Sequence, residues 1–172
     1  MVQVRWREAK TPCIALRQFN CVGERETHPY VIPEIISQLN ISPLHKMVKG
    51  ASRTVKLGNN SFRDFLYAGD QARMAVELLE KGNFGEVYNL GSESGIKIYD
   101  LAQRIATVAG FGVIEVEVDD TRIRPWEIWH LQSDNTKIYS VIDSRPEVSL
   151  DSALKRTVDY FNNHNQRWCW ER

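Results

Sequence analysis

The sequence predicts an α/β fold with a small mixed sheet and several amphipathic helices. The main observation is a strand, helix, strand unit between Phe62 and Gly91, about thirty residues long, the size of a crossover in an α/β sheet. Two further segments, 98–109 and 150–161, repeat apolar residues with the period of an amphipathic helix. A chain of 172 residues is long enough to fold as one domain, so we expect a single domain, residues 1–172, around one core.

The spacing of apolar residues changes along the central unit, Phe62 to Gly91, from that of a strand to that of a helix and back. The run Phe65–Tyr67 is short and aromatic, as in a strand, and Glu86–Leu90 is a second short strand that ends at Gly91. Between them Asp70 is the expected N-cap of a helix that Gly82 ends. The predicted apolar face of this helix comprises Ala72, Ala75, Val76 and Leu79.

The residues before this unit give mixed signals. Residues 1–11 are polar and predict an irregular or fraying helical lead, whereas the apolar opening of 13–20 predicts a strand buried on both faces. Pro33 suits the first turn of a helix, where a missing N–H is harmless. We expect a loop at 40–49 and an alternating strand at 53–57.

After the central unit, regular helical patterns at the beginning and the end of the remaining chain are separated by an irregular segment. The helix at 98–109 is followed by 113–118, which alternates like a half-solvated strand. Segment 119–133 is irregular and holds arginines, a proline and two tryptophans. Asp134 begins a short helix, and Ser149 is the expected cap of the last amphipathic helix.

Composition and charge exclude several classes of function. Lys plus Arg and Asp plus Glu both number 22, so the net charge is zero, whereas a nucleic-acid binder would carry a basic excess. No segment approaches the roughly 18 apolar residues of a membrane span, and the N-terminus lacks the apolar region of a signal peptide. We therefore expect no nucleic-acid partner, no membrane association and a cytoplasmic location.

The metal-ligating and nucleophilic residue types form no recognisable site. No C-x-x-C spacing occurs among the three cysteines, Cys13, Cys21 and Cys169, which we interpret as buried thiols. No i, i+4 pair occurs among the four histidines, His28, His45, His130 and His164. Without G-x-S-x-G or a Cys/His arrangement, the sequence predicts neither a metal site nor acyl transfer.

Three groups of residues occur in an order and at distances that carry a family resemblance. The first is LRQFNCVG at 16–23, and the second is RDFLY, a D-x-A-x-x-A helix and YNLG at 63–91. The third is R-x-R-P-x-E, D-x-x-K and P-x-x-S-L-x-x-x-L-K-R-T-V-x-Y-F. Together they resemble the second half of the extended short-chain dehydrogenase/reductase family, the NAD-dependent sugar-nucleotide epimerases and dehydratases, over roughly residues 12–165.

Two motifs of that family are missing from these 172 residues. The close glycines Gly110 and Gly112 follow a helix and have Glu115 where a third glycine would stand, so there is no dinucleotide-binding turn. None of the six tyrosines is followed by a lysine at the Y-x-x-x-K spacing. The chain thus resembles a carboxy-terminal portion of a family member. The resemblance implies that this chain alone has no catalytic residue and binds no cofactor, whereas full-length relatives bind NAD.

The resemblance implies a set of substrate-binding residues. Arg63 and Arg124 match the two arginines that clamp the diphosphate of the sugar nucleotide, and guanidinium groups bind phosphate oxygens bidentately. Asn20 matches an asparagine that hydrogen-bonds the substrate near its phosphates. Tyr88 and Asn89 are expected beside the nucleotide.

Each of these residues also has a purely structural interpretation. Arg63 can pair with an acidic neighbour, as most arginines do. Arg124 lies near two tryptophans in sequence and can stack on an indole. Asn20 precedes a glycine-containing loop and can act only as a turn former.

Three hypotheses for function follow. The first is binding of a nucleotide diphosphate sugar without turnover. The second is an enzyme completed in trans by a separate Rossmann half or a partner subunit, because a lone second half would expose an apolar face. The third is a non-catalytic module that dimerises through that face, and a homodimer is the expected assembly.

Overall fold

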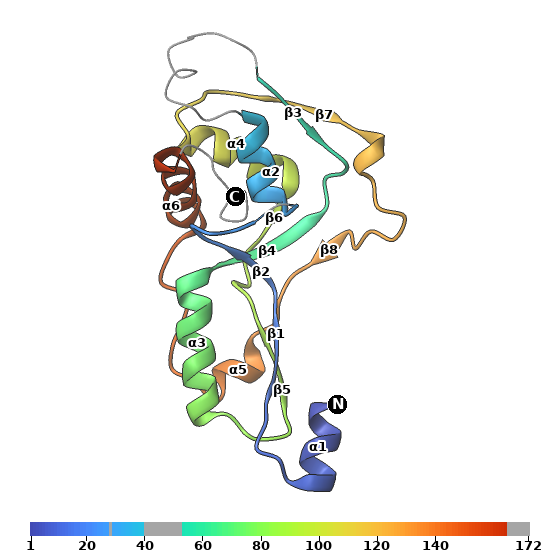
Figure 1. The fold of residues 1–172 in the computed structure, drawn as a ribbon, viewed down its shortest axis with the longest axis vertical. Helices are drawn as coiled ribbons and strands as arrows, with labels where there is room; N and C mark the ends of the chain where they lie inside the picture. Colours follow the sequence, from blue (N-terminus) through green and yellow to red (C-terminus); the bar gives the residue numbers. More distant parts are fainter. Residues whose placement is uncertain (28, 40–52, 165–172) are drawn as a thin grey trace.

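Two hydrophobic clusters follow one another along the length of the molecule (Figure 1). The structure is a computed structural model, and it describes residues 1–27, 29–39 and 53–164. The loop expected at 40–49, and Cys169, lie outside the described residues. Strands and helices alternate along the chain, so the α/β class is confirmed.

The larger cluster is built on a four-stranded mixed sheet. Its central strand β4 (Phe62–Tyr67) pairs with β2 (Asn20–Val22) and β8 (His130–Leu131) in parallel and with β6 (Gly95–Lys97) antiparallel. The helices of this cluster are α2 (Val31–Leu39), α4 (Ile98–Val108) and α6 (Leu150–Asn163). Their apolar faces supply most of the buried side chains, as their periodicity predicts.

A two-stranded parallel pair extends the same end of the molecule. It joins β3 (Thr54–Leu57) to β7 (Glu115–Val118). In β3 buried and exposed side chains alternate, so the strand expected at 53–57 is confirmed. A short 3-10 helix η2 (Asp120–Arg122) follows β7 and begins the irregular segment.

The smaller cluster lies at the other end of the molecule (Figure 1). Strands β1 (Ala15–Gln18) and β5 (Val87–Leu90) form a parallel pair that packs against α3 (Ala68–Lys81) and α5 (Thr136–Tyr139). Helix α1 (Val2–Ala9) buries no residue and touches this end through Trp6, whose ring lies 5.7 Å from that of Phe84. The expected single core is therefore divided into two clusters among the described residues.

The strand predicted at 13–20 differs from the structure in two ways. It is divided into β1 and β2, and the side chains of Arg17 and Gln18 are exposed rather than buried. In the described chain β1 has one neighbour, β5, so one of its edges carries no pairing strand. The prediction of burial on both faces was wrong because apolar composition does not reveal how many strands flank a strand.

The helix of the central unit presents a different face from the predicted one. It begins after Tyr67, so Asp70 lies inside its first turn and is not the N-cap. Its buried apolar residues are Met74 and Leu78, whereas Val76 is 59% exposed and Leu79 is 68% exposed. The sequence contains two overlapping apolar stripes, and packing against β5 and α5 selects the stripe that the prediction did not.

Asp64 connects the mixed sheet to two loops. Its side chain is fully buried and accepts hydrogen bonds from the N–H and Oγ of both Ser92 and Ser133, and from the N–H of Glu93. Because neighbouring side chains in a strand point to opposite faces, burying Asp64 directs Arg63 to the other side of β4. The Arg-Asp pair thus positions one residue for structure and one for a surface cleft.

The remaining predicted elements are confirmed. Helix α4 ends near Gly110, and the hydroxyl of Ser149 accepts a hydrogen bond from the N–H of Ser152 at the start of α6. Within the described ranges no helix is long and apolar enough to span a membrane. The same residues contain no group of three or more His, Cys, Asp or Glu side chains placed to hold a metal ion.

Candidate functional site

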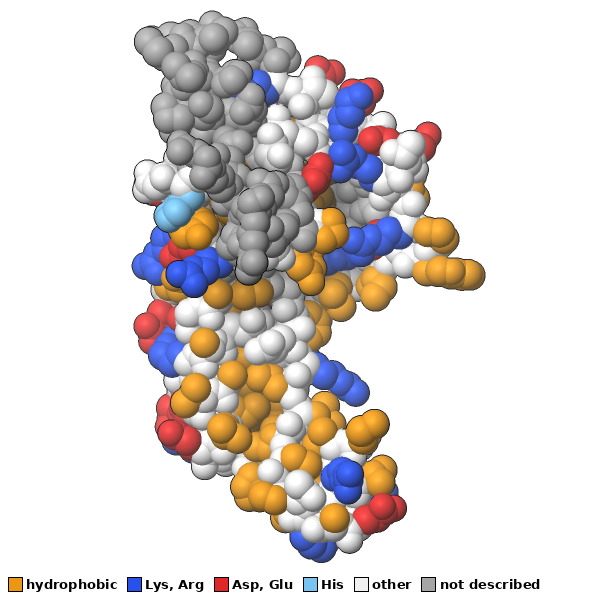
Figure 2. Space-filling model, in the orientation of Figure 1, with side chains coloured by type: hydrophobic (Ala, Val, Ile, Leu, Met, Phe, Trp, Pro, Cys, Tyr) orange, Lys and Arg blue, Asp and Glu red, His pale blue; other side chains and the backbone are white. Residues whose placement is uncertain are grey.

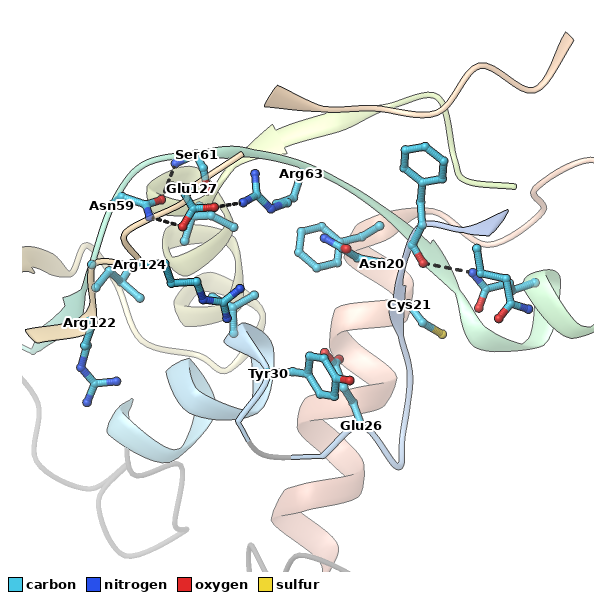
Figure 3. Close-up of a pocket in the computed structure, with 18 residues that line it drawn as sticks. Asn20, Cys21, Glu26, Tyr30, Asn59, Ser61, Arg63, Arg122, Arg124 and Glu127 are labelled. Carbon is cyan, nitrogen blue, oxygen red and sulfur yellow. Dashed lines mark hydrogen bonds and ion pairs between the residues drawn. The ribbon is translucent and has the colours of Figure 1, made fainter. Parts of the chain in front are cut away.

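A cleft of about 580 Å³ opens beside the mixed sheet (Figure 3). Its walls come from β2, the start of α2, the turn between β3 and β4, and the irregular segment after β7. Three of the five residues proposed from sequence line it, namely Asn20, Arg63 and Arg124. Segments more than one hundred positions apart in the chain therefore contribute side chains to one cavity.

Arg63 is held in the wall of the cleft by an acidic neighbour. Its guanidinium group pairs with the carboxylate of Glu127 and donates hydrogen bonds to the carbonyl oxygens of Ile128, at 2.6 Å, and Phe62, at 2.8 Å. Only 14% of the Arg63 side chain and 9% of the Glu127 side chain are exposed. The structural interpretation of Arg63 as an ion-paired residue is thus correct, although the residue also lines the cleft.

Arg124 differs from Arg63 in having no partner among the residues that the structure describes. It is exposed at the rim of the cleft, and no residue in the described part of the chain accepts a hydrogen bond from it or pairs with it. Among these residues no indole stacks on it either, and Trp126 beside it is 93% exposed. Its charge is therefore available to an anion in the cleft.

Arg122 is a third arginine at the cleft, which the sequence reasoning missed. It pairs with Glu34 at 2.8 Å and with Asp119 at 3.1 Å, and the hydrogen bond to Glu34 raises the pKa of its guanidinium group. The R-x-R spacing was the available signal, although Arg122 ends the 3-10 helix η2 and Arg124 follows it. Glu34 and Asp119 neutralise much of its charge.

Asn20 is placed by strand pairing. It is the first residue of β2, opposite Phe65 of β4, so it is not a turn residue. Next to it, the backbone carbonyl of Phe19 accepts a hydrogen bond from Gln71 at 3.4 Å. This side of the cleft therefore carries neutral amide groups, whereas the other side carries arginines.

Glu26 also lines the cleft and gave no signal in the sequence. Its side chain is largely buried, and burial raises the pKa of its carboxyl group to about 8. Cys21 lies beside it, and burial together with the nearby Glu26 raises the pKa of that thiol. A single glutamate in a polar loop has no motif, so only the folded chain identifies it.

Tyr88 and Asn89 lie away from the cleft. Both belong to β5 in the smaller cluster, where Tyr88 is 1% exposed and its hydroxyl accepts a hydrogen bond from the N–H of Asn83. Neither residue is among those that line the cleft. The structure therefore places both residues apart from the cleft, in strand β5.

The arrangement suits an anionic ligand. The start of α2, at Tyr30 and Val31, contributes to the cleft wall, and helix N-termini carry a partial positive charge. Arg124, which lies on the left side of Figure 3 and has no partner among the described residues, adds a full positive charge there, whereas the charges of Arg63 and Arg122 are balanced by Glu127, Glu34 and Asp119. The opposite side offers neutral hydrogen-bonding groups.

Known proteins with similar sequences are sugar-nucleotide enzymes. The dTDP-D-glucose 4,6-dehydratase of Homo sapiens is 27% identical over 171 residues, an alignment that covers 97% of this chain and 46% of that protein. The chain thus spans about half the length of the relatives it matches.

Solved structures of the same kind share the fold. A dTDP-glucose 4,6-dehydratase from Bacillus anthracis, in complex with NAD, has a TM-score of 0.78 at 21% identity and covers 97% of this chain and 50% of its own. A UDP-glucuronic acid 4-epimerase variant from Bacillus cereus, in complex with a fluorinated UDP-sugar and NAD, has a TM-score of 0.75 at 24% identity, over 94% of this chain and 48% of its own. These neighbours confirm the extended short-chain dehydrogenase fold.

The family model matches residues 1–157, which include every residue that lines the cleft and the whole of the smaller cluster. This chain therefore belongs to the GDP-mannose 4,6 dehydratase family.

Proposed function

We propose that this chain binds a nucleotide diphosphate sugar in the cleft between β2, β4 and the segment after β7. Arg124 is the principal ligand of the diphosphate, with Arg63 as the second arginine and Asn20 hydrogen-bonding close to the phosphates. The chain binds the ligand without turning it over, because its 172 residues contain neither the Y-x-x-x-K pair nor the dinucleotide turn.

One observation carries this proposal. Arg63 and Arg124, sixty-one positions apart in sequence, line the same cavity, and Arg124 has no partner among the described residues. An exposed arginine at the rim of a cleft, near a helix N-terminus, is a suitable site for a phosphate group. The relatives that carry sugar-nucleotide names support the same ligand class.

The Arg63–Glu127 pair gives the proposal a specific consequence. For Arg63 to bind a phosphate, its guanidinium group must exchange Glu127 for the ligand. The carboxylate of Glu127 also accepts a hydrogen bond from Asn59 at 2.7 Å, so it retains a partner when Arg63 leaves. We therefore propose that Arg124 contacts the diphosphate first and contributes more to its initial binding. Arg63 contacts it later, after it has left Glu127.

Calorimetric titration with UDP-, dTDP-, GDP- and CDP-sugars tests the proposal. At least one should bind, and Arg124→Ala should weaken it by about tenfold or more, the effect of losing a charge-assisted hydrogen bond. Arg104→Ala is the matched control, because Arg104 is exposed on α4 and pairs with Asp151, outside the cleft. Absence of heat with every sugar nucleotide, or equal affinities for wild type and Arg124→Ala, would contradict the proposal.

A second candidate function is an enzyme completed by a Rossmann half, in trans or in a partner subunit. Two observations favour it: β1 has an unpaired edge in the described chain, and α3 exposes Ala72, Val76 and Leu79 along one side. Figure 2 shows hydrophobic side chains gathered over this end of the molecule. An unpaired strand edge beside an apolar helix face is a typical protein-binding surface.

Sedimentation and NAD titration separate the two candidates. If the chain only binds a sugar nucleotide and is not completed by a Rossmann half, the isolated chain should not change NAD fluorescence, whether it is a monomer or a homodimer. Completion predicts association, and NAD binding by the complex with the added half. A monomer at all concentrations, with no response to an added Rossmann half, would eliminate completion in trans.

A further inference from the structure

The carboxyl group of Glu26 lies between the cleft and a second cavity. The N–H of Glu26 donates to the carbonyl oxygen of Gly23 at 3.2 Å, which closes a tight turn directly after β2. Cys21, Glu26 and Tyr30 line both the cleft and an adjoining cavity of about 570 Å³. A ligand group that extends from the cleft in this direction therefore passes the carboxyl group.

One oxygen of this carboxyl group has no partner. Oε2 of Glu26 is buried and makes no hydrogen bond in the described part of the chain. Glu24, two positions earlier, differs because the hydroxyl of Tyr67 donates to its carboxylate at 3.1 Å. A buried polar atom without a partner costs about 1–3 kcal/mol, so a ligand that supplies the missing hydrogen bond gains affinity from it.

Burial also determines the chemical form of the group. The pKa of about 8 means that the carboxyl is mostly protonated at neutral pH. A protonated carboxyl offers one O–H donor and one carbonyl acceptor. This pair is complementary to a hydroxyl or amide group, which also donates and accepts.

The position of Glu26 relative to the arginines indicates which ligand group it meets. In Figure 3, Arg122 and Arg124 lie on one side of the cleft, and Asn20 and Glu26 lie toward the other. A diphosphate held by Arg124 therefore has one of its two substituents near Glu26. The amide side chains of Gln18, Asn20 and Gln71 line the cleft as well, and such polar walls suit a hydroxyl-rich glycosyl unit better than a planar base.

We infer that Glu26 is a specificity-determining residue that hydrogen-bonds an uncharged hydroxyl or amide group of the glycosyl unit of a sugar nucleotide. This inference rests on the proposed function of the cleft. It adds that Glu26 recognises the glycosyl unit of the ligand. It concerns binding only, and no bond is made or broken.

The test compares each sugar nucleotide with its own nucleoside diphosphate by calorimetry on the full chain. The pairs are UDP-glucose and UDP, dTDP-glucose and dTDP, and GDP-mannose and GDP. The measured quantity is the dissociation constant of the nucleoside diphosphate divided by that of its sugar nucleotide. Glu26→Leu should reduce this ratio by on the order of tenfold, the value of one hydrogen bond, with the affinity for the nucleoside diphosphate unchanged. Glu26→Gln should preserve the ratio, because its amide still donates and accepts.

Glu24→Gln is the matched control, because it changes the neighbouring glutamate that already has a partner. An unchanged ratio in Glu26→Leu would overturn the inference while leaving the proposed function intact. Absence of binding by all six probes would overturn the proposed function and this inference with it. The two failures are therefore distinguishable.

A measurement on the wild-type chain avoids any dependence on how a variant folds. Cys21 lies beside Glu26, so the glycosyl unit should shield its thiol. UDP-glucose, or the sugar nucleotide that binds best, should slow alkylation of Cys21 more than the matching nucleoside diphosphate does, as mapped by mass spectrometry. Equal rates with both probes would place the glycosyl unit elsewhere and contradict the inference.

Discussion

Glu127 occupies the position at Arg63 that a phosphate group would take. The pair is mostly buried, and the remaining guanidinium bonds go to backbone carbonyls. Glu127→Gln removes the competing negative charge and can keep the hydrogen bond to Asn59. Because a negative charge next to a bound diphosphate is unfavourable, we predict several-fold tighter binding of the sugar nucleotide to Glu127→Gln.

Calorimetry on wild type and Glu127→Gln at two salt concentrations measures this effect. The gain should largely persist at the higher salt concentration, because a buried charge such as that of Glu127 is screened much less than an exposed one. Weaker binding by the variant would mean that Glu127 contacts the ligand directly.

At the residue scale, a motif predicts the side chains that it contains and no others. Asn20, Arg63 and Arg124 were identified from the family resemblance and lie in one cleft. Glu26 belongs to no motif, and Arg122 belongs to the R-x-R-P motif but was not assigned a role. Tyr88 was proposed from the same resemblance but lies in the smaller cluster, outside the cleft. Whether Arg63 is paired also depends on Glu127, sixty-four positions away, which no local pattern indicates.

The buried carboxylate of Asp64 links strand β4 to the loops that contain Ser92 and Ser133. Burial acts to raise the pKa of this group, but the hydrogen bonds from Ser133 and Ser92 outweigh burial and hold the pKa below its usual value. A carboxylate with a lowered folded-state pKa stabilises the fold above its unfolded pKa of about 3.9, and this contribution is lost as pH falls through the folded-state pKa. Part of the acid sensitivity of the chain therefore comes from Asp64.

Asp64→Asn tests this role. The amide cannot accept all five hydrogen bonds, so we predict a loss of at least about 2 kcal/mol in the free energy of unfolding at pH 7. Urea titrations at pH 7 and pH 3 should show a smaller difference at the lower pH. An equal loss at both pH values would contradict the assigned pKa shift.

Helix α3 offers a matched pair of adjacent leucines. Leu78 is 2% exposed in the smaller cluster, whereas Leu79 is 68% exposed. We predict that Leu78→Ala costs about 2–5 kcal/mol of unfolding free energy and Leu79→Ala costs less than about 0.5 kcal/mol. Chemical denaturation of both variants checks this, and a large loss for Leu79→Ala would show that a partner covers that face in solution.

At the element scale, periodicity predicted the helices and most strands but not all their faces. Helix α4 and strand β3 each have a single apolar pattern, and both pack as predicted. Helix α3 has two apolar stripes, and tertiary packing selects one of them. Strand β1 was expected to be buried because segment 13–20 opens with an apolar run, but its burial depends on neighbours that come from elsewhere in the chain.

For the whole molecule, the α/β class was predictable and the division into two clusters was not. Local sequence patterns predict which residues form strands, but pairing such as β2 with β4, or β3 with β7, joins segments more than forty positions apart. The cleft lies against the larger cluster, whereas the unpaired edge of β1 and the exposed face of α3 belong to the smaller one. Substitutions in the proposed ligand cleft and on the proposed partner surface therefore fall in different clusters.

A crystal structure of the chain with its tightest-binding sugar nucleotide tests the central claim most directly. The account predicts diphosphate density within roughly 3 Å of the guanidinium nitrogens of Arg124, with Asn20 beside it and Arg63 turned from Glu127 toward a phosphate oxygen. Density for the ligand outside the cleft, or a diphosphate that touches neither Arg63 nor Arg124, would contradict it.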